Sequence, residues 1–322
     1  MMINPDHLPE HYYDMDHVRV DDGRIYRVLG NFALDDGGFL AYNLYSPDPA
    51  GDRTFRGVNY VKNYTEDNTS PRDVLDTYDI LAPGDVAEYF DPISAAKEMI
   101  ATYDGTVWAK LYRKLTDIFG TESIGIFGSA LPGSGLHQNP DGSIKNDVDF
   151  FIEGLENIPK LERQLPAVRE DLGFSDYDTA SQQGIIRAWS KVFRNPNNTL
   201  DEIMARRWSG MQLDDAGRIV LNTFRFRDRN VVVPPQLLAA KNIIRRNVEV
   251  EGVAIDTQQG NLYPRAFAVE SAGSQYPVYS FWWKFSSPVR EMDQVAVCGD
   301  VIDVNGKEVL RLTNYEDHWI HL

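Results

Sequence analysis

The sequence predicts an α+β fold made of three units, and three observations lead to this prediction. Residues 1–90 are rich in aromatic and β-branched runs separated by turn residues, as in a small antiparallel β unit. Residues 91–235 combine helical periodicity with two apolar strand patterns. Residues 248–322 return to short strand patterns. A chain of 322 residues has room for two or three such units.

The N-terminal unit contains three strand patterns, which begin at Arg24, Gly38 and Thr54 and are joined by turns rich in Asp and Gly. They predict a small antiparallel sheet that ends near residue 65. Ser70 followed by Pro71 has the pattern of a helix start. The basic side chains of this sheet either face a phosphate ligand or cover a solvated face. They are Arg24, Arg27, Arg53, Arg56 and Lys62.

The central unit should begin with an amphipathic helix over residues 93–118, in which apolar side chains recur at three- and four-residue steps. Gly105 interrupts this pattern, and Gly120 is placed to end the helix. Thr199 precedes a helix predicted over residues 200–208, where a Thr-x-x-Glu pattern predicts a capping box. Two more elements, a helix and an alternating strand, are expected over residues 159–172 and 217–226.

The C-terminal unit has the pattern of a small β-barrel, for which an OB-like fold is one option. Asn305-Gly306, between two apolar segments, is a strong hairpin signal. The aromatic run at residues 279–285 either packs the core of the barrel or stacks on bases. Short strands are expected at residues 249–255, 276–285, 294–298 and 309–312.

The formal net charge of −16 limits the classes of partner. An acidic surface repels phosphate backbones, so a long nucleic acid is disfavoured unless basic side chains gather locally, and solubility is the simplest explanation of the charge. No segment has the roughly 18 unbroken apolar residues that a membrane helix needs, and no secretory signal is evident. Cys298 is the single cysteine, which excludes an intramolecular disulfide and favours the cytoplasm.

The chain is organised around residues 124–151. An apolar strand pattern ends at Gly128-Ser129, a connection rich in Gly and Pro follows, and a second strand pattern begins with Asp147-Val148-Asp149. Side chains two apart on a strand project from the same face, so both aspartates can reach one metal cluster. Carboxylates suit Mg²⁺ or Mn²⁺, and two such ions can clamp the oxygens of a phosphoryl transfer. Gly128 lets the backbone approach a phosphate, and the Ser129 hydroxyl adds a donor.

This order of an apolar strand, Gly-Ser, a linker and Asp-x-Asp resembles the polymerase-β-like nucleotidyltransferase superfamily. The resemblance implies a nucleotidyltransferase-like core, with a mixed sheet and helices, in the central part of the chain. It implies that Ser129 contacts the triphosphate of an NTP and that Asp147 and Asp149 are Mg²⁺ ligands. The linker of 18 positions is longer than is usual in the family. His137 and Lys145, within this linker, are candidates for contacting the acceptor.

The third carboxylate of the family motif has no clear match. The strand that should carry it corresponds best to residues 218–227, where Asn222 or Thr223 would occupy the expected place. On an ideal strand Asp228 would project from the same face as Asn222, but it lies at the end of this strand. The third ligand is therefore Asp228, another residue, or absent.

These observations predict an enzyme that transfers an NMP group from an NTP to a small-molecule or protein acceptor and releases pyrophosphate. An RNA- or tRNA-directed transferase and a non-catalytic nucleotide-binding protein are the alternatives, and an exposed loop with two solvated aspartates is the simplest structural explanation. Arg225, Arg227 and Arg229 share one strand face, where they either bind a polyanion or pair with local acids. The remaining basic residues of this part are Arg206, Arg207, Lys241, Arg245 and Arg246.

Overall fold

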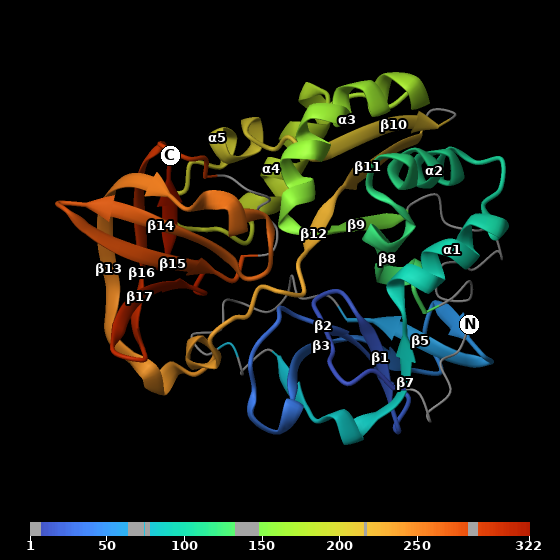
Figure 1. The fold of residues 1–322 in the computed structure, drawn as a ribbon, viewed down its shortest axis with the longest axis horizontal. Helices are drawn as coiled ribbons and strands as arrows, with labels where there is room; N and C mark the ends of the chain where they lie inside the picture. Colours follow the sequence, from blue (N-terminus) through green and yellow to red (C-terminus); the bar gives the residue numbers. More distant parts are fainter. Residues whose placement is uncertain (1–7, 64–73, 75–77, 133–147, 216–217, 283–288) are drawn as a thin grey trace.

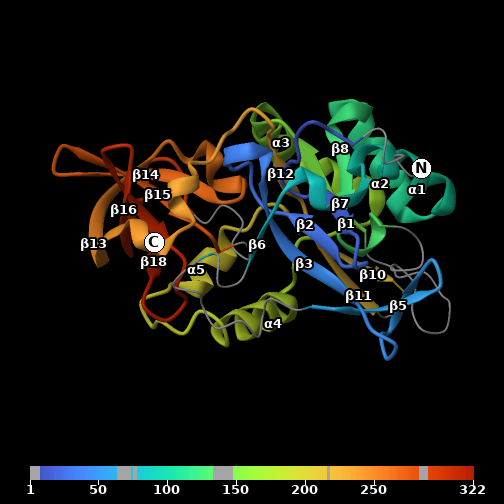
Figure 2. The ribbon, with the colours of Figure 1, turned by 90° about the horizontal axis from the view of Figure 1, so that it is seen from below.

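The computed structural model describes residues 8–63, 74, 78–132, 148–215, 218–282 and 289–322, and it has the mixed α+β character that the sequence predicts. Figures 1 and 2 show a C-terminal barrel at one end of the molecule. The N-terminal sheet and the first two helices, α1 (Pro92–Thr102) and α2 (Val107–Phe119), lie together at the other end, whereas α4 (Thr179–Ser190) and α5 (Leu200–Ala205) lie beside the barrel. The helix start expected at Ser70 and Pro71 lies outside the described residues.

The N-terminal strands form one antiparallel sheet with the curvature of half a barrel. Its order is β4-β5-β3-β2-β1-β7, and β6 also pairs with β3. Apolar side chains such as Val18, Tyr26 and Leu81 fill the concave side. The strands are β1 (His17–Val20), β2 (Ile25–Val28), β3 (Phe39–Pro47), β4 (Arg53–Phe55), β5 (Val58–Lys62), β6 (Asp79–Leu81) and β7 (Val86–Phe90).

The central part contains a three-stranded sheet in the order β12-β9-β8. Strand β8 is antiparallel to β9, and β12 is parallel to it. A separate hairpin is formed by β10 and β11. The elements are α1 (Pro92–Thr102), α2 (Val107–Phe119), β8 (Ile124–Phe127), β9 (Asp149–Glu153), α3 (Ile158–Leu172), α4 (Thr179–Ser190), α5 (Leu200–Ala205), β10 (Gly210–Asp215), β11 (Arg218–Thr223) and β12 (Arg225–Arg227).

Local sequence signals place the helix boundaries of the first two helices. The predicted helix is divided at Gly105, whose φ is +80°, and the Thr106 side chain accepts a hydrogen bond from Ala109 N to cap α2. Gly120, with a φ of +87°, ends α2, as expected. The capping box at Thr199 is wrong, because the Thr199 side chain makes no cap hydrogen bond and its hydroxyl accepts one from Leu322 N instead. That helix ends at Ala205 rather than at residue 208.

The single strand expected over residues 217–226 is instead two strands in two sheets. Strand β11 pairs with β10, whereas β12 pairs with β9. The break falls at Phe224, which is buried and whose backbone N–H donates to Ser209 O at 3.1 Å. Strand pairing with two different partners therefore overrides the continuous alternation in the sequence.

The C-terminal strands close into a five-stranded barrel, because β13 pairs with both β14 and β16. The order around the barrel is β13-β14-β15-β17-β16, in which only the β15–β17 pair of the described strands is parallel. Asn305 and Gly306, with φ of +54° and +80°, make the predicted hairpin turn. The strands are β13 (Ile243–Ile255), β14 (Arg265–Ser271), β15 (Ser274–Ser280), β16 (Gln294–Val304), β17 (Lys307–Leu312) and β18 (Trp319–His321). Within the described part of the chain, no helix is long and apolar enough to cross a membrane.

The two faces of the central sheet have different environments, and this difference positions the site. Ile126, Phe150 and Phe226 belong to the apolar cluster that also contains side chains of α2 and α3. Phe127 and Phe151 project from the other face and pack against Met15 of the N-terminal unit. In Figure 1 the N-terminal sheet and the helices α2 and α3 lie on opposite sides of β8 and β9. The face that carries Asp149 is therefore the one that the N-terminal unit covers.

Candidate functional site

The structure brings Gly128-Ser129 and Asp149 together at one edge of the central sheet. Phe127, the last residue of β8, pairs with Asp149, the first residue of β9, and a short 3-10 turn over Gly128–Ala130 follows β8. Gly128 has a φ of +70°, and a Cβ at this position would lie 2.8 Å from Oδ2 of Asp149. Glycine is required here both for its backbone conformation and for the room that the carboxylate needs. Asp147, His137 and Lys145 lie outside the described residues.

The register of β12 on β9, extended beyond its last paired residue, points to Thr223 for the position expected for a third carboxylate. Arg225 on β12 pairs with Phe151 on β9, so extending this parallel register by two residues puts Thr223 beside Asp149. The Thr223 hydroxyl accepts a hydrogen bond from the Arg207 guanidinium and makes another, 2.8 Å long, with the Tyr177 hydroxyl. Threonine was one of the two candidates for this position, and it is a neutral residue held within a polar network.

The structure does not bring Asp228 to Asp149. Asp228 follows the far end of β12, five positions beyond Thr223, which is about 16 Å along an extended strand. Its two carboxylate oxygens accept hydrogen bonds from Leu155 N at 3.0 Å and from Asn230 N at 2.9 Å. The side chain is buried and shapes the loops at that end of the sheet. Asp228 therefore cannot share a metal ion with Asp149.

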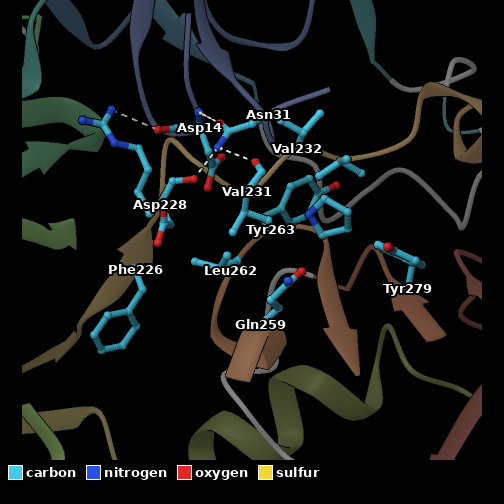
Figure 3. A pocket seen from close by; sticks show the side chains of 13 residues that line it. Asp14, Asn31, Phe226, Asp228, Val231, Val232, Gln259, Leu262, Tyr263 and Tyr279 are labelled. Atoms are coloured by element: carbon cyan, nitrogen blue, oxygen red, sulfur yellow. Dashed lines mark hydrogen bonds between the residues drawn. The ribbon is translucent and has the colours of Figure 1, made fainter. Parts of the chain in front are cut away.

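A hollow at the Asp228 end lies between the N-terminal unit, β12 and the barrel (Figure 3). It encloses about 340 Å³ of empty space, which includes open solvent. Asn31 donates to Asp228 O at 2.7 Å and to Val231 O at 3.1 Å, and its own side-chain oxygen accepts from Asp14 N at 2.9 Å. These bonds join the units to one another, so the hollow is a junction and lies away from Asp149.

Four arginines from all three parts of the chain lie near one another, and Arg225 among them interacts electrostatically with Asp149. Arg27 lies on β2, and its guanidinium carbon is 5.0 Å from the centre of the Phe127 ring. The other three are Arg207, which follows α5, Arg225 on β12 and Arg265 at the start of β14. We call these four residues the arginine cluster. Arg27, Arg207 and Arg225 are among the basic side chains that the sequence singles out, whereas no local pattern marks Arg265.

The electrostatics of Arg225 show how closely the cluster is assembled. Burial, together with the positive charges of Arg207 and Arg27, lowers the pKa of Arg225 to about 10, while Asp149 opposes the shift. Burial also lowers the pKa of Arg265, followed by the charges of Arg225 and Arg207. Arg225 and Arg265 therefore lie within the field of neighbouring arginines, and Asp149 acts on Arg225.

The other two arginines on this strand face pair with acids, but Arg227 is buried rather than on the solvated face that the sequence predicts. Arg227 is fully buried, and its guanidinium donates to Asp16 at 2.6 Å and to Glu153 at 2.7 Å. It also lies over the Phe151 ring, 4.3 Å from the ring centre. Arg229 is 3.4 Å from the Glu153 carboxylate. Arg225 thus belongs to the arginine cluster, whereas Arg227 and Arg229 serve the contact with the N-terminal unit.

The metal site remains an expectation that depends on Asp147. Among the residues described, no three His, Cys, Asp or Glu side chains are grouped so that they could hold a metal ion. Asp149 fits such a role, because its carboxylate is half-buried beside the Gly128 turn. Comparison of the chain with family models, with curated proteins and with solved structures finds no match. The case for function therefore rests on the geometry of this edge of the sheet.

Proposed function

We propose that the protein is a metal-dependent nucleotidyltransferase that moves an NMP group from an NTP to an acceptor and releases pyrophosphate. The observation that carries this proposal is the contact between the Gly128 turn and the Asp149 carboxylate. A backbone turn that can bind phosphate and a carboxylate that can bind Mg²⁺ or Mn²⁺ are both needed where a triphosphate is cleaved. Asp149 would hold the metal together with Asp147, and Ser129 would bind the triphosphate.

Two features of the fold support the same proposal. The central sheet combines an antiparallel pair, β8 and β9, with a parallel third strand, and helices cover one face. This arrangement agrees with the mixed sheet that the resemblance to polymerase-β-like enzymes implies. The strand order of the barrel, with its parallel β15–β17 pair, supports the OB-like option for the C-terminal unit.

The acceptor is a small molecule or a protein in this proposal, because a net charge of −16 opposes a long polyanion. The arginine cluster does not reverse this argument, because it is not an open basic surface. Arg265 is only 4% exposed, and the other three side chains are partly buried. An RNA-directed enzyme would show binding that weakens steeply with salt. Salt-independent transfer to a metabolite or protein would favour the first acceptor class.

A non-catalytic nucleotide-binding protein is the second candidate, and Thr223 favours it. A neutral residue beside Asp149 cannot supply the third carboxylate that would help to bind metal and activate a nucleophile. Such a protein would bind an NTP with metal but would release no pyrophosphate.

Label transfer tests the proposal directly. The full chain is incubated with each α-labelled NTP, Mg²⁺ or Mn²⁺, and cell fractions that contain RNA, protein or metabolites. Asp149→Asn should abolish transfer and pyrophosphate release, whereas Asp104→Asn, a change at an exposed aspartate, should leave both unchanged. Transfer that persists in Asp149→Asn would refute the site, and metal-dependent NTP binding without transfer would favour the second candidate.

A further inference from the structure

We propose that the arginine cluster is a binding site for a phosphate chain and that it is complete only when all three units of the chain are docked. The inference rests on the proposed function in one respect, because it assigns the bound phosphates to the donor NTP. Its chemistry, the binding of several linked phosphates by guanidinium groups, does not depend on whether transfer occurs.

The N-terminal and central contributions meet at the edge of the sheet that holds Asp149. Arg27 lies over Phe127, which pairs with Asp149 across β8 and β9. Arg225 lies on the neighbouring strand, in register with Phe151, and interacts electrostatically with Asp149 and Arg27. Positive charge from β2 and from β12 therefore borders the position where the Gly128 turn offers its backbone N–H groups.

The other two arginines are held rigidly by their surroundings. Arg207 packs over the rings of Tyr177 and Trp189, with its guanidinium carbon 5.3 and 5.7 Å from the ring centres. Arg265 donates to Leu262 O at 3.2 Å, so the barrel backbone fixes its guanidinium. Both side chains have little freedom to lose when a ligand binds, which favours tight binding.

An anionic ligand is the partner that this charge distribution favours. Like charges oppose one another, and Arg207 and Arg27 lie near enough to Arg225 for their charges to act on it. A ligand with several negative charges would relieve this repulsion. The Nε atoms of Arg27 and Arg207 are buried and have no hydrogen-bond partner among the described residues, so each keeps an unused donor. Guanidinium groups match phosphate through paired N–H donors.

A chain of phosphates fits better than a single anion, because the four arginines are carried by different elements of the chain. Arg27 comes from the N-terminal sheet, Arg225 from the central sheet and Arg265 from the barrel. One ligand that contacts all of them bridges the three units, so its binding should stabilise the whole chain against unfolding. The same phosphate chemistry could come from the donor triphosphate or from a phosphorylated acceptor, and the experiment separates these two sources.

Calorimetric titration of the full-length protein with inorganic tripolyphosphate, in EDTA, measures the site without metal. Arg27→Gln and Arg225→Gln should each weaken binding about 10- to 100-fold, as expected for a lost charged hydrogen bond. Two matched controls should change binding less than about twofold. They are Arg24→Gln in the same unit as Arg27 and Arg245→Gln in the barrel, both exposed and paired with an acid. Tripolyphosphate should also raise the unfolding temperature of the wild type.

Arg265 is buried, so it is tested with a more conservative substitution. Arg265→Lys keeps the charge but loses the guanidinium fork, and circular dichroism checks that the barrel is folded. Its binding should weaken less than that of a folded Arg265→Gln variant. If folded Arg27→Gln and Arg225→Gln bind tripolyphosphate as the wild type does, or if the wild type does not bind it, the inference is overturned.

Competition identifies the source of the phosphates. If ATP displaces tripolyphosphate and loses affinity in the same variants, the cluster binds the donor. If ATP binding is unchanged in these variants but glycerol phosphate loses affinity, the cluster binds the phosphate of an acceptor. Binding that depends on the arginines without any NMP transfer would refute the proposed function alone. Transfer that requires Asp149 but is unaffected by the arginine variants would refute this inference alone.

Discussion

Arg227 joins the N-terminal unit to the central sheet, so Arg227→Met should destabilise the protein strongly. The guanidinium is fully buried and bonded to Asp16 at 2.6 Å, to Glu153 at 2.7 Å and to Asp14 O at 3.2 Å. Removing it leaves the carboxylate of Asp16 buried without its partner. Breaking a buried pair in this way costs about 3–5 kcal/mol, and methionine keeps most of the packing against Phe151.

The cost of Arg227→Met should depend on pH. Burial raises the pKa of Asp16 from its ordinary value of 3.8 to about 6, although Arg227 opposes the shift. Folded Asp16 thus keeps its proton to a higher pH than unfolded Asp16, so this stabilising contribution is present below pH 3.8 and is lost as the pH rises to about 6. The contribution amounts to about 3 kcal/mol. Without Arg227 the pKa rises further, so the variant should lose the most stability at pH 8 and less at pH 5.

Equilibrium unfolding in urea at pH 8 and pH 5 measures both effects. Arg113→Met is the matched control, because Arg113 and Asp104 form a pair in which the side chains are 53% and 71% exposed. An exposed pair contributes about 0–1 kcal/mol. Adding Asp16→Asn to Arg227→Met should restore part of the stability at pH 8. The reasoning fails if Arg227→Met costs no more than the control at pH 8, or if Asp16→Asn restores nothing.

Four more outcomes are expected. Burial lowers the pKa of His17 from 6.5 to about 3, so the protein loses stability as the pH falls below 6.5, by about 2 kcal/mol at pH 5. In urea unfolding, His17→Asn should reduce this dependence of stability on pH. Burial raises the pKa of Cys298 to about 11, so iodoacetamide should label it only after unfolding. In Gly128→Ala the positive φ strains the backbone by about 1–2 kcal/mol, and the added Cβ crowds the Asp149 carboxylate. This variant should lose NTP turnover but keep its circular dichroism spectrum. Thr223→Asp should tighten Mn²⁺ binding in calorimetry if Asp149 is a metal ligand, and unchanged Mn²⁺ affinity would contradict this register-based assignment.

The parts of the fold that the sequence predicts correctly depend on contacts within a few residues. Gly105 and Gly120 adopt positive φ where the helices stop, and Asn305-Gly306 adopts the hairpin conformation for the same local reason. The errors involve residues whose partners are distant in the sequence. The Thr199 hydroxyl accepts a hydrogen bond from Leu322 N, 123 positions away, so the capping-box pattern alone cannot predict the hydrogen-bond partner of Thr199. The arginine cluster likewise forms only when three units meet.

The third position beside Asp149 depends on which face of β12 is buried. Phe224 and Phe226 belong to the helix-covered core, so the alternate residues Thr223 and Arg225 share the opposite face with Asp149. Asp228 has the same parity as the two phenylalanines, and an ideal strand would therefore point it away from Asp149 even if it were nearer. The positions of Phe224 and Phe226 in the sequence are enough to predict which side chains face the helix-covered core. The register, in contrast, is set by the pairing of β12 with β9 and cannot be predicted from the sequence. On this face Thr223 is neutral and Arg225 interacts electrostatically with Asp149, so positive charge dominates the described part of the site. The described edge of the sheet is therefore better equipped to hold phosphates than to hold metal, and the proposed metal site requires Asp147 as a second ligand.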